Sequence, residues 1–145
     1  MSKPGESPAA RAAFRRFVPV QTRWADNDVY GHVNNIAYYG YFDTAVNLYL
    51  IEQCGLDIHE GEVIGLVVET GCRYHAPIAY PDALEVGLRA ARIGTSSVTY
   101  EVAVFRRGAD EAVAEGRFVH VYVDRSTRRP RPLPAAMRAG LEAIG

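Results

Sequence analysis

The sequence contains little lysine, little cysteine and no long apolar segment. Lys3 is the single lysine, and no apolar run approaches the ~20 residues that a membrane-spanning helix needs. Residues 1–16 also lack the apolar segment of a signal peptide. Arginine carries the positive charge instead, and 16 basic against 17 acidic residues give a formal net charge of −1, which would not attract a nucleic acid. These absences predict a soluble, cytoplasmic protein that binds neither nucleic acid nor a membrane.

The cysteines and histidines do not have the spacing of a disulfide framework or a zinc site. Cys54 and Cys72 are the two cysteines, and without a secretory signal we expect free thiols rather than a disulfide. Asp28, His32 and His75 could suggest a metal site, but their spacing fits no compact zinc motif. We therefore predict no metal site.

Length and composition indicate one folded domain. The 145 residues are 48% apolar and 23% charged, and a chain of this size buries roughly 68–70% of the surface that it exposes when unfolded. Residues 1–13 contain proline, glycine and serine but almost no large apolar residue, which predicts a flexible N-terminal arm before a domain of residues 14–145. The domain is short for an enzyme that builds a whole substrate cleft within one subunit.

One long helix is predicted over residues 35–54. Asn34 and Asn35 supply the expected N-cap chemistry, and Gly55 follows the last helical position. The segment has no proline and few polar side chains, so apolar and aromatic residues cover most of its circumference. We expect this helix to be largely enclosed by the rest of the domain.

The remaining segments favour strands joined by short turns. Partly alternating or β-branched sequence predicts strands at 17–24, 65–74, 84–93, 97–105 and 112–123, and a short helix at 135–144. The short connections after residues 93 and 106 indicate antiparallel hairpins. The expected architecture is α+β, with a five-stranded antiparallel sheet wrapped around the long helix. Such a sheet has edge strands, and dimerisation through an edge would cover one of them.

The densest group of polar residues lies between the first strand and the long helix. Its members are Asp26, Asn27, Asp28, Tyr30, Gly31, His32, Asn34 and Asn35. Taken by spacing alone, these residues are typical of Asx-turns and of a helix cap. A carboxylate beside a helix N-terminus is also what acyl transfer requires, because the helix amides can stabilise a developing negative charge.

The full motif decides between these interpretations. Residues 23–38 and 41–43 contain the pattern D-x-D-x-x-G-H-V-N-N-x-x-Y, which resembles the signature of hotdog-fold acyl-CoA thioesterases of the 4-hydroxybenzoyl-CoA thioesterase type. The resemblance implies hydrolysis of an acyl-CoA to a free acid and coenzyme A, without a metal or redox cofactor. It also implies a homodimer, often paired into a homotetramer, with sites at the subunit interface.

The resemblance places three catalytic roles in this loop. Asp28 corresponds to the catalytic carboxylate, which acts either as the nucleophile or as the general base for water. The backbone amide of Asn35 corresponds to the group that polarises the thioester carbonyl. His32 orients the loop or bonds the attacking water, and the orienting role is favoured.

Substrate-binding residues are expected in two further places. By resemblance, the turn before the fourth strand helps to bind coenzyme A, which assigns Arg92, Thr95, Ser96 and Ser97 to substrate binding, with Arg89 or residues 125–131 as other sources of positive charge. Tyr38 or Tyr41 would line an acyl pocket, although core packing is the simpler role for most tyrosines here. The family commonly has an arginine three residues after the acid at Asp43, where this chain has Val46. We therefore expect Asp43 to be a hydrogen-bonded structural acid.

Other functions fit the same fold. A catalytically silent module would bind acyl-CoA or an acyl carrier protein without turnover, and a related enzyme would hydrolyse acyl-carrier-protein thioesters. Asp28 argues against a silent module, because a pure binder does not need a carboxylate facing a thioester. A hydratase would normally pair a histidine with an acid in a different motif.

Overall fold

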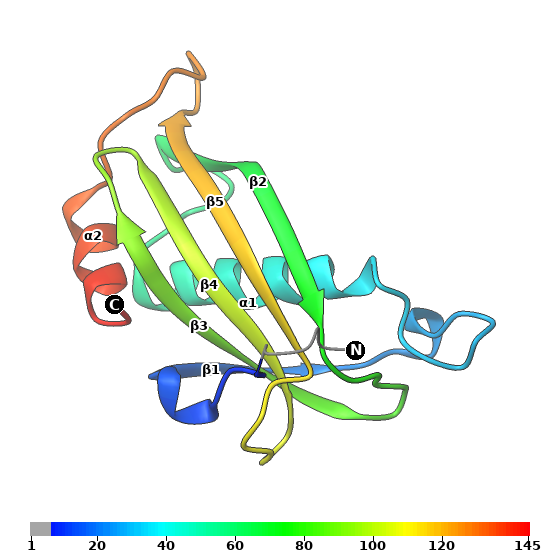
Figure 1. Cartoon of the computed structure of the whole chain (residues 1–145). Helices are drawn as coiled ribbons and strands as arrows, with labels where there is room; N and C mark the ends of the chain where they lie inside the picture. Colours follow the sequence, from blue (N-terminus) through cyan, green and yellow to red (C-terminus); the bar gives the residue numbers. More distant parts are fainter. Residues whose placement is uncertain (1–6) are drawn as a thin grey trace.

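The protein folds as one antiparallel sheet packed against a long helix. The computed structural model describes residues 7–145. The strands are β1 (Arg16–Gln21), β2 (Val63–Tyr74), β3 (Ala83–Ile93), β4 (Ser97–Arg106) and β5 (Ala114–Asp124), in the order β1-β3-β4-β5-β2. Helix α1 (Ala37–Gln53) crosses one face of the sheet, and α2 (Ala135–Glu142) lies at one side of it (Figure 1). The predicted hotdog architecture is confirmed.

The predicted element boundaries agree with the structure to within two residues, except at the end of the first strand. Helix α1 begins at Ala37 rather than at residue 35, and both expected hairpins, β3–β4 and β4–β5, are antiparallel pairs. The first strand ends at Gln21, so its prediction to residue 24 is wrong. Trp24 starts a 3-10 helix, η2 (Trp24–Asp26), and is 83% exposed. Its apolar side chain continues the strand-like pattern without taking part in the sheet.

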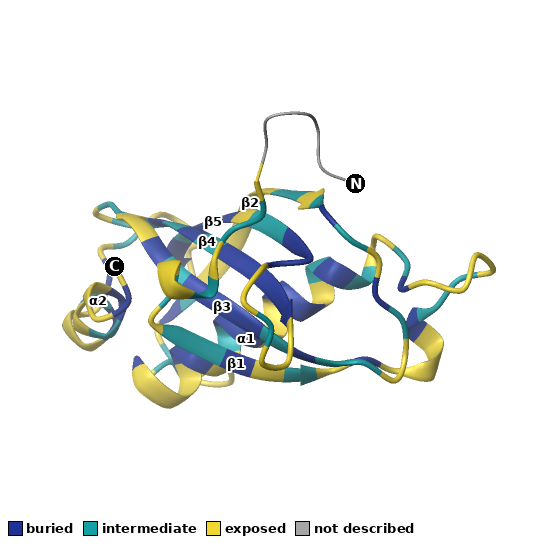
Figure 2. Ribbon diagram, turned by 60° about the horizontal axis from the view of Figure 1, so that its bottom comes forward, coloured by how far each residue is buried: buried dark blue, intermediate teal, exposed yellow. Residues whose placement is uncertain are grey.

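The core lies between the sheet and one side of α1. The helix contributes Tyr38, Tyr41, Phe42, Ala45, Val46, Tyr49 and Leu50. Figure 2 shows long buried stretches in α1 and the central strands, whereas the loop before α1 is mostly exposed. At Gly116 of β5 a Cβ atom would lie 2.5 Å from a ring carbon of Phe42, so the glycine allows the helix to approach the sheet closely. The opposite side of α1, which includes Gly40, Asp43 and Thr44, is exposed, so the expected enclosure is incomplete within one chain.

Part of the predicted N-terminal arm is bound to the domain. Residues 1–6 lie outside the described part of the chain. The Arg11 amide donates to the carbonyl of Asp110 at 2.8 Å, and the Ala9 amide donates to the Glu115 carboxylate at 3.0 Å. Arg11 also forms an ion pair with Glu85. In this part of the predicted arm, hydrogen bonds and an ion pair to the domain accompany the lack of large apolar side chains.

Strand β2 is a long edge strand with one free side. It pairs with β5, and no strand among residues 7–145 pairs with its other side. Leu66, Val67 and Val68 are exposed in the middle of the strand, with Val68 58% accessible. Exposed apolar residues on a free edge favour pairing with another chain.

The two cysteines are free, as predicted. Burial raises the pKa of both the Cys54 and the Cys72 thiols to about 11. Both are therefore neutral thiols at physiological pH. No helix within residues 7–145 is long and apolar enough to cross a membrane.

Candidate active site

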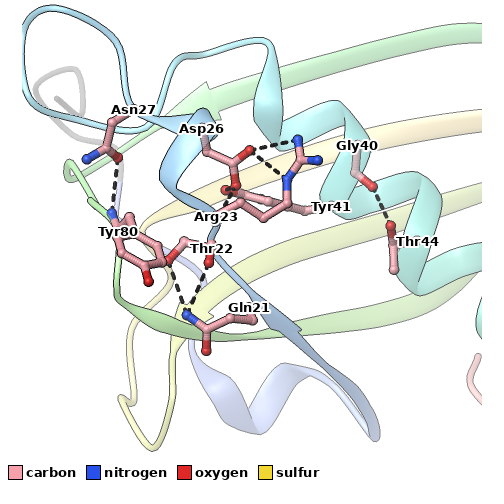
Figure 3. Close-up of polar contacts among 9 residues, drawn as sticks. All are labelled: Gln21, Thr22, Arg23, Asp26, Asn27, Gly40, Tyr41, Thr44 and Tyr80. Atoms are coloured by element: carbon pink, nitrogen blue, oxygen red, sulfur yellow. Dashed lines mark hydrogen bonds and ion pairs between the residues drawn. The ribbon is translucent and has the colours of Figure 1, made fainter.

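A buried carboxylate fixes the start of the loop between β1 and α1. Asp26 is 4% exposed and accepts hydrogen bonds from the Tyr41 hydroxyl at 2.7 Å and from the Arg23 amide at 2.8 Å (Figure 3). The Arg23 guanidinium adds bonds at 3.0 and 3.2 Å. Burial by itself would raise the pKa of Asp26, but these hydrogen bonds and the nearby positive charge hold it below its ordinary value of 3.8. Asp26 thus ties the loop to the first turns of α1 as an anion.

A second segment, residues 75–82, supports the loop from the other side. The Val33 amide donates to the carbonyl of Ile78 at 2.8 Å, and the Tyr80 amide donates to the Asn27 side chain at 3.0 Å (Figure 3). The Arg106 guanidinium binds the carbonyl of Pro77. Residues 75–82 therefore hold the loop that carries the candidate catalytic residues at two points, Asn27 and Val33.

Asp28 lies in a tight turn within this loop. One of its carboxylate oxygens accepts a hydrogen bond from the Tyr30 amide at 2.9 Å, which is the expected Asx-turn. The Gly31 amide donates to the Asp28 carbonyl at 3.1 Å, and Gly31 has a φ of 83°, a conformation that favours glycine. The second carboxylate oxygen receives no hydrogen bond from the described residues. Asp28 therefore combines a fixed backbone with one carboxylate oxygen available to a ligand.

The Asn35 backbone amide, just before the start of α1, has no acceptor among residues 7–145. The Asn34 amide donates to the Asp26 carbonyl, the Ile36 amide to the Asn34 side chain, and the Ala37 amide to the Asn34 carbonyl. Of the amides from residue 33 to residue 37, only that of Asn35 has no acceptor among the described residues. An unpaired N–H at a helix start can bind an anion or a developing oxyanion.

A cavity of about 280 Å³ lies beside this unpaired amide. Its lining residues are His32, Val33, Asn35, Tyr38, Tyr74, Ala76 and Pro77. The rings of Tyr38 and Tyr74 meet edge to face at 5.0 Å, and burial raises the pKa of Tyr38 to about 12. The structure thus brings together three of the predicted residues, His32, Asn35 and Tyr38. Asp28 is in the same loop but does not line this cavity.

A larger cavity of about 780 Å³ lies on the other side of the helix start. It is lined by parts of β1, by the loop at Asp26 and Asn34, and by the exposed side of α1 at Gly40 and Thr44. The helix start is therefore flanked by open space on both sides. Only the smaller cavity is lined by Asn35.

The predicted coenzyme A residues lie far from this loop in the same chain. Thr95 and Ser96 lie in the turn between β3 and β4, and Arg92 and Ser97 lie at the strand ends next to it. The end of β1 at Gln21 pairs with the first residue of β3, Ala83, whereas the turn follows the last residue of β3. An 11-residue strand separates the two ends by roughly 30 Å. Figure 1 shows the turn near α2 and the candidate loop at the opposite end of the molecule.

Asp43 has neither the predicted hydrogen-bond partner nor an arginine three residues later. Its carboxylate makes no hydrogen bond or ion pair within residues 7–145, so the expectation of a hydrogen-bonded acid is wrong. Val46, at the family's arginine position, is fully buried in the core. Partial burial raises the pKa of Asp43 above its ordinary value.

The sequence does not indicate the residues that support the site from distant segments of the chain. Tyr74 is the last residue of β2, and its hydroxyl donates to the Asn35 carbonyl at 3.0 Å. Proline residues at 77 and 81 indicate a turn over residues 77–82, but nothing local indicates that this turn binds the loop about 50 residues earlier. His75 is buried and contacts the Glu115 carboxylate at 2.5 Å. No group of three metal-binding side chains occurs in the described part of the chain.

Comparisons with known proteins agree with this architecture. The PA5185 protein of Pseudomonas aeruginosa is 56% identical, with 96% of each chain covered and a TM-score of 0.93. A thioesterase from Thermus thermophilus, crystallised with coenzyme A and Zn, is 33% identical, with 88% of this chain and 98% of that chain covered and a TM-score of 0.74. A 1,4-dihydroxy-2-naphthoyl-CoA thioesterase from Synechocystis shares the fold at 19% identity, with 86% and 93% coverage and a TM-score of 0.77. No curated protein matches the chain.

The family follows from the sequence itself as well as from these structures. A model of the thioesterase-like superfamily matches residues 22–141, which include the candidate loop, α1 and the whole of β2 to β5. The matched part contains every site residue predicted from the sequence. The chain is therefore a member of the thioesterase-like superfamily with a hotdog fold.

Proposed function

We propose that the protein hydrolyses an acyl-CoA thioester to a carboxylic acid and coenzyme A. The unpaired Asn35 amide at the start of α1, seven residues after the Asp28 carboxylate in one rigid loop, is the observation that carries this proposal. A thioester hydrolase needs a carboxylate and a hydrogen-bond donor for the oxyanion, and this loop offers both. The thioesterase relatives support the same reaction class.

The proposed reaction places the thioester carbonyl oxygen at the Asn35 amide. As a general base, Asp28 takes a proton from the water that attacks the carbonyl carbon. As a nucleophile, it attacks that carbon itself and forms a mixed anhydride, which water then hydrolyses. In both routes the carbon–sulfur bond breaks and coenzyme A leaves as a thiol after protonation. His32, in the wall of the cavity, helps to orient the loop.

The proposal requires a second copy of the chain. The candidate loop and the β3–β4 turn with Arg92 and Thr95 are too far apart to bind one substrate within a single chain. We propose that two copies pair through the free edge of β2, so that the partner contributes to the acyl pocket and the coenzyme A site. The exposed Val67 and Val68 would be covered in this dimer.

Sedimentation should show the wild-type protein as a dimer or tetramer. Val67→Glu is expected to shift it to a monomer, because the change buries a carboxylate at the proposed interface without a partner. Ala91→Glu, at an exposed position of β3, serves as the control and should sediment like the wild type. An active wild-type protein that sediments strictly as a monomer would contradict the dimer proposal.

The activity is tested by free-thiol release from acyl-CoAs of varied chain length, aryl-CoAs and acyl-carrier-protein thioesters. We expect turnover of at least one CoA ester, with a higher kcat/KM than for the same acyl group on the carrier protein. Preference for the carrier protein would replace the proposal by an acyl-carrier-protein thioesterase. Binding of acyl-CoA without release of thiol would instead identify a non-catalytic module.

A further inference from the structure

The Tyr74 hydroxyl is bound to the peptide that follows the candidate oxyanion amide. Tyr74 ends β2, and its hydroxyl donates to the carbonyl of Asn35 at 3.0 Å across 39 residues of sequence. Its ring packs edge to face on Tyr38 at 5.0 Å, and both rings line the 280 Å³ cavity. A β2 residue is thus joined directly to the start of α1.

This hydrogen bond fixes the one residue at the helix start that the other contacts leave less constrained. Asn34 is held through its amide, its carbonyl and its side chain. Asn35 has an unpaired amide and an exposed side chain, so its carbonyl bond to Tyr74 is the one hydrogen bond that holds it among residues 7–145. Without that bond the two peptide groups that meet at Asn35 would be freer to rotate.

The Asn35 carbonyl also matters electrostatically. Its oxygen carries partial negative charge and belongs to the same residue as the amide proposed to bind the oxyanion. A carbonyl that turned toward the cavity would repel the negative charge that develops on the substrate oxygen. The Tyr74 hydroxyl holds that carbonyl oxygen and compensates part of its charge.

We propose that Tyr74 is a positioning residue, which acts through the Asn35 peptide to keep the oxyanion amide directed at the substrate. The inference rests on the proposed function, because it assumes that Asn35 binds the thioester oxygen. Tyr74 itself acts at a distance from the reacting carbon, and its contribution lies in preorganisation of the donor rather than in proton transfer.

The hydroxyl of Tyr74 is suited to this task because it stays protonated. Burial raises its pKa well above the ordinary value, and the neighbouring Cys72 and Tyr39 raise it further. Cys72, with its own pKa raised to about 11, is also neutral near pH 7. Tyr74 therefore remains a donor to the Asn35 carbonyl throughout the pH range in which an acyl-CoA thioesterase would be assayed.

The test compares Tyr74→Phe with Tyr49→Phe. Tyr49 is a matched control, because its hydroxyl also donates to a backbone carbonyl, that of Gly140 at 2.6 Å, but at the far end of α1. For Tyr74→Phe we expect kcat to fall roughly tenfold, less than the 10²- to 10³-fold of removing an oxyanion donor outright, with KM within twofold. The loss should be constant between pH 6 and 9. Tyr49→Phe should keep the wild-type kcat, and both variants should lose a similar amount of thermal stability.

Ground-state binding separates positioning from a merely structural role. A non-hydrolysable acyl-CoA, in which a methylene replaces the thioester sulfur, should bind Tyr74→Phe with the wild-type Kd in calorimetry. This measurement also shows that the variant's site is folded. A wild-type kcat for Tyr74→Phe, or equal losses in kcat and ligand affinity, would overturn the inference while leaving the proposed function intact. A wild-type protein that releases no thiol from any acyl-CoA would instead overturn the proposed function.

Discussion

Replacement of Asp28 by asparagine should lower kcat for acyl-CoA hydrolysis by roughly 10³- to 10⁴-fold, the scale seen when a catalytic aspartate is neutralised in other acyl-transfer enzymes. Asparagine has nearly the same shape, and its side-chain oxygen can accept the Tyr30 amide that Asp28 accepts at 2.9 Å. The turn is therefore kept, whereas the negative charge and the basic oxygen are lost. Thiol release under substrate saturation measures the effect.

Asp57 provides a matched control for this substitution. Its side chain also closes an Asx-turn, accepting the amides of His59 and Glu60 at 3.0 and 3.1 Å in an exposed loop. Asp57→Asn should therefore leave kcat unchanged, since that carboxylate is not in the candidate loop. Retention of most activity by Asp28→Asn would show that another group performs the chemistry.

Isotope labelling separates the two roles proposed for Asp28. In the nucleophilic route, water that attacks the Asp28 carbonyl of the mixed anhydride leaves one ¹⁸O in that side chain. In the general-base route, the label enters the product acid alone. Mass spectrometry of the Asp28 peptide after turnover in H₂¹⁸O, together with trapping of an acyl-enzyme, distinguishes the routes.

Local sequence signals predicted most of the fold. The predictions of α1 and of both hairpins depend on helix-end residues, on the absence of proline and on short turns, which act between near neighbours in the chain. Trp24 shows where this fails, because an apolar residue in an alternating pattern can equally lie exposed in the next turn. The bound segment 9–13 shows the same limit, since its partners Asp110 and Glu115 are about 100 residues away.

In the candidate site, too, the residues that lie close together in the sequence could be predicted and those from distant segments could not. The loop residues Asp28, His32 and Asn35 stand in one continuous motif, so the sequence could indicate them together. Tyr74 joins the site only because antiparallel pairing of β2 with β5 brings the end of β2 to the start of α1. The sequence separation of Arg92 from Asp28 does not indicate that these two residues lie at opposite ends of the folded molecule. The proposal of a site shared between two copies therefore rests on this distance in the fold as well as on the resemblance of the motif.

Asp26 is expected to contribute to the stability of the loop rather than to the reaction. Removal of its carboxylate in Asp26→Ala leaves the buried Tyr41 hydroxyl and the Arg23 amide without their acceptor. We expect a loss of about 3 kcal/mol in the free energy of unfolding at pH 7, because a buried donor left without an acceptor costs about 1–3 kcal/mol. Tyr41→Phe, which removes one donor and leaves the Arg23 bonds, should cost about 1 kcal/mol. Urea unfolding measures both changes.

The pH dependence gives this prediction a second, independent test. The Asp26 pKa is lower in the folded protein than its ordinary value of 3.8, because the hydrogen bonds outweigh the effect of burial. Its stabilisation is therefore complete well above pH 3.8 and is lost as the pH falls through the folded-state pKa. The difference in unfolding free energy between the wild type and Asp26→Ala should be constant from pH 6 to 7 and should narrow below pH 4. A difference in unfolding free energy that increases as the pH falls would mean that Asp26 is protonated in the folded state. The loop would then be tied to α1 by a neutral hydrogen bond rather than by an anion.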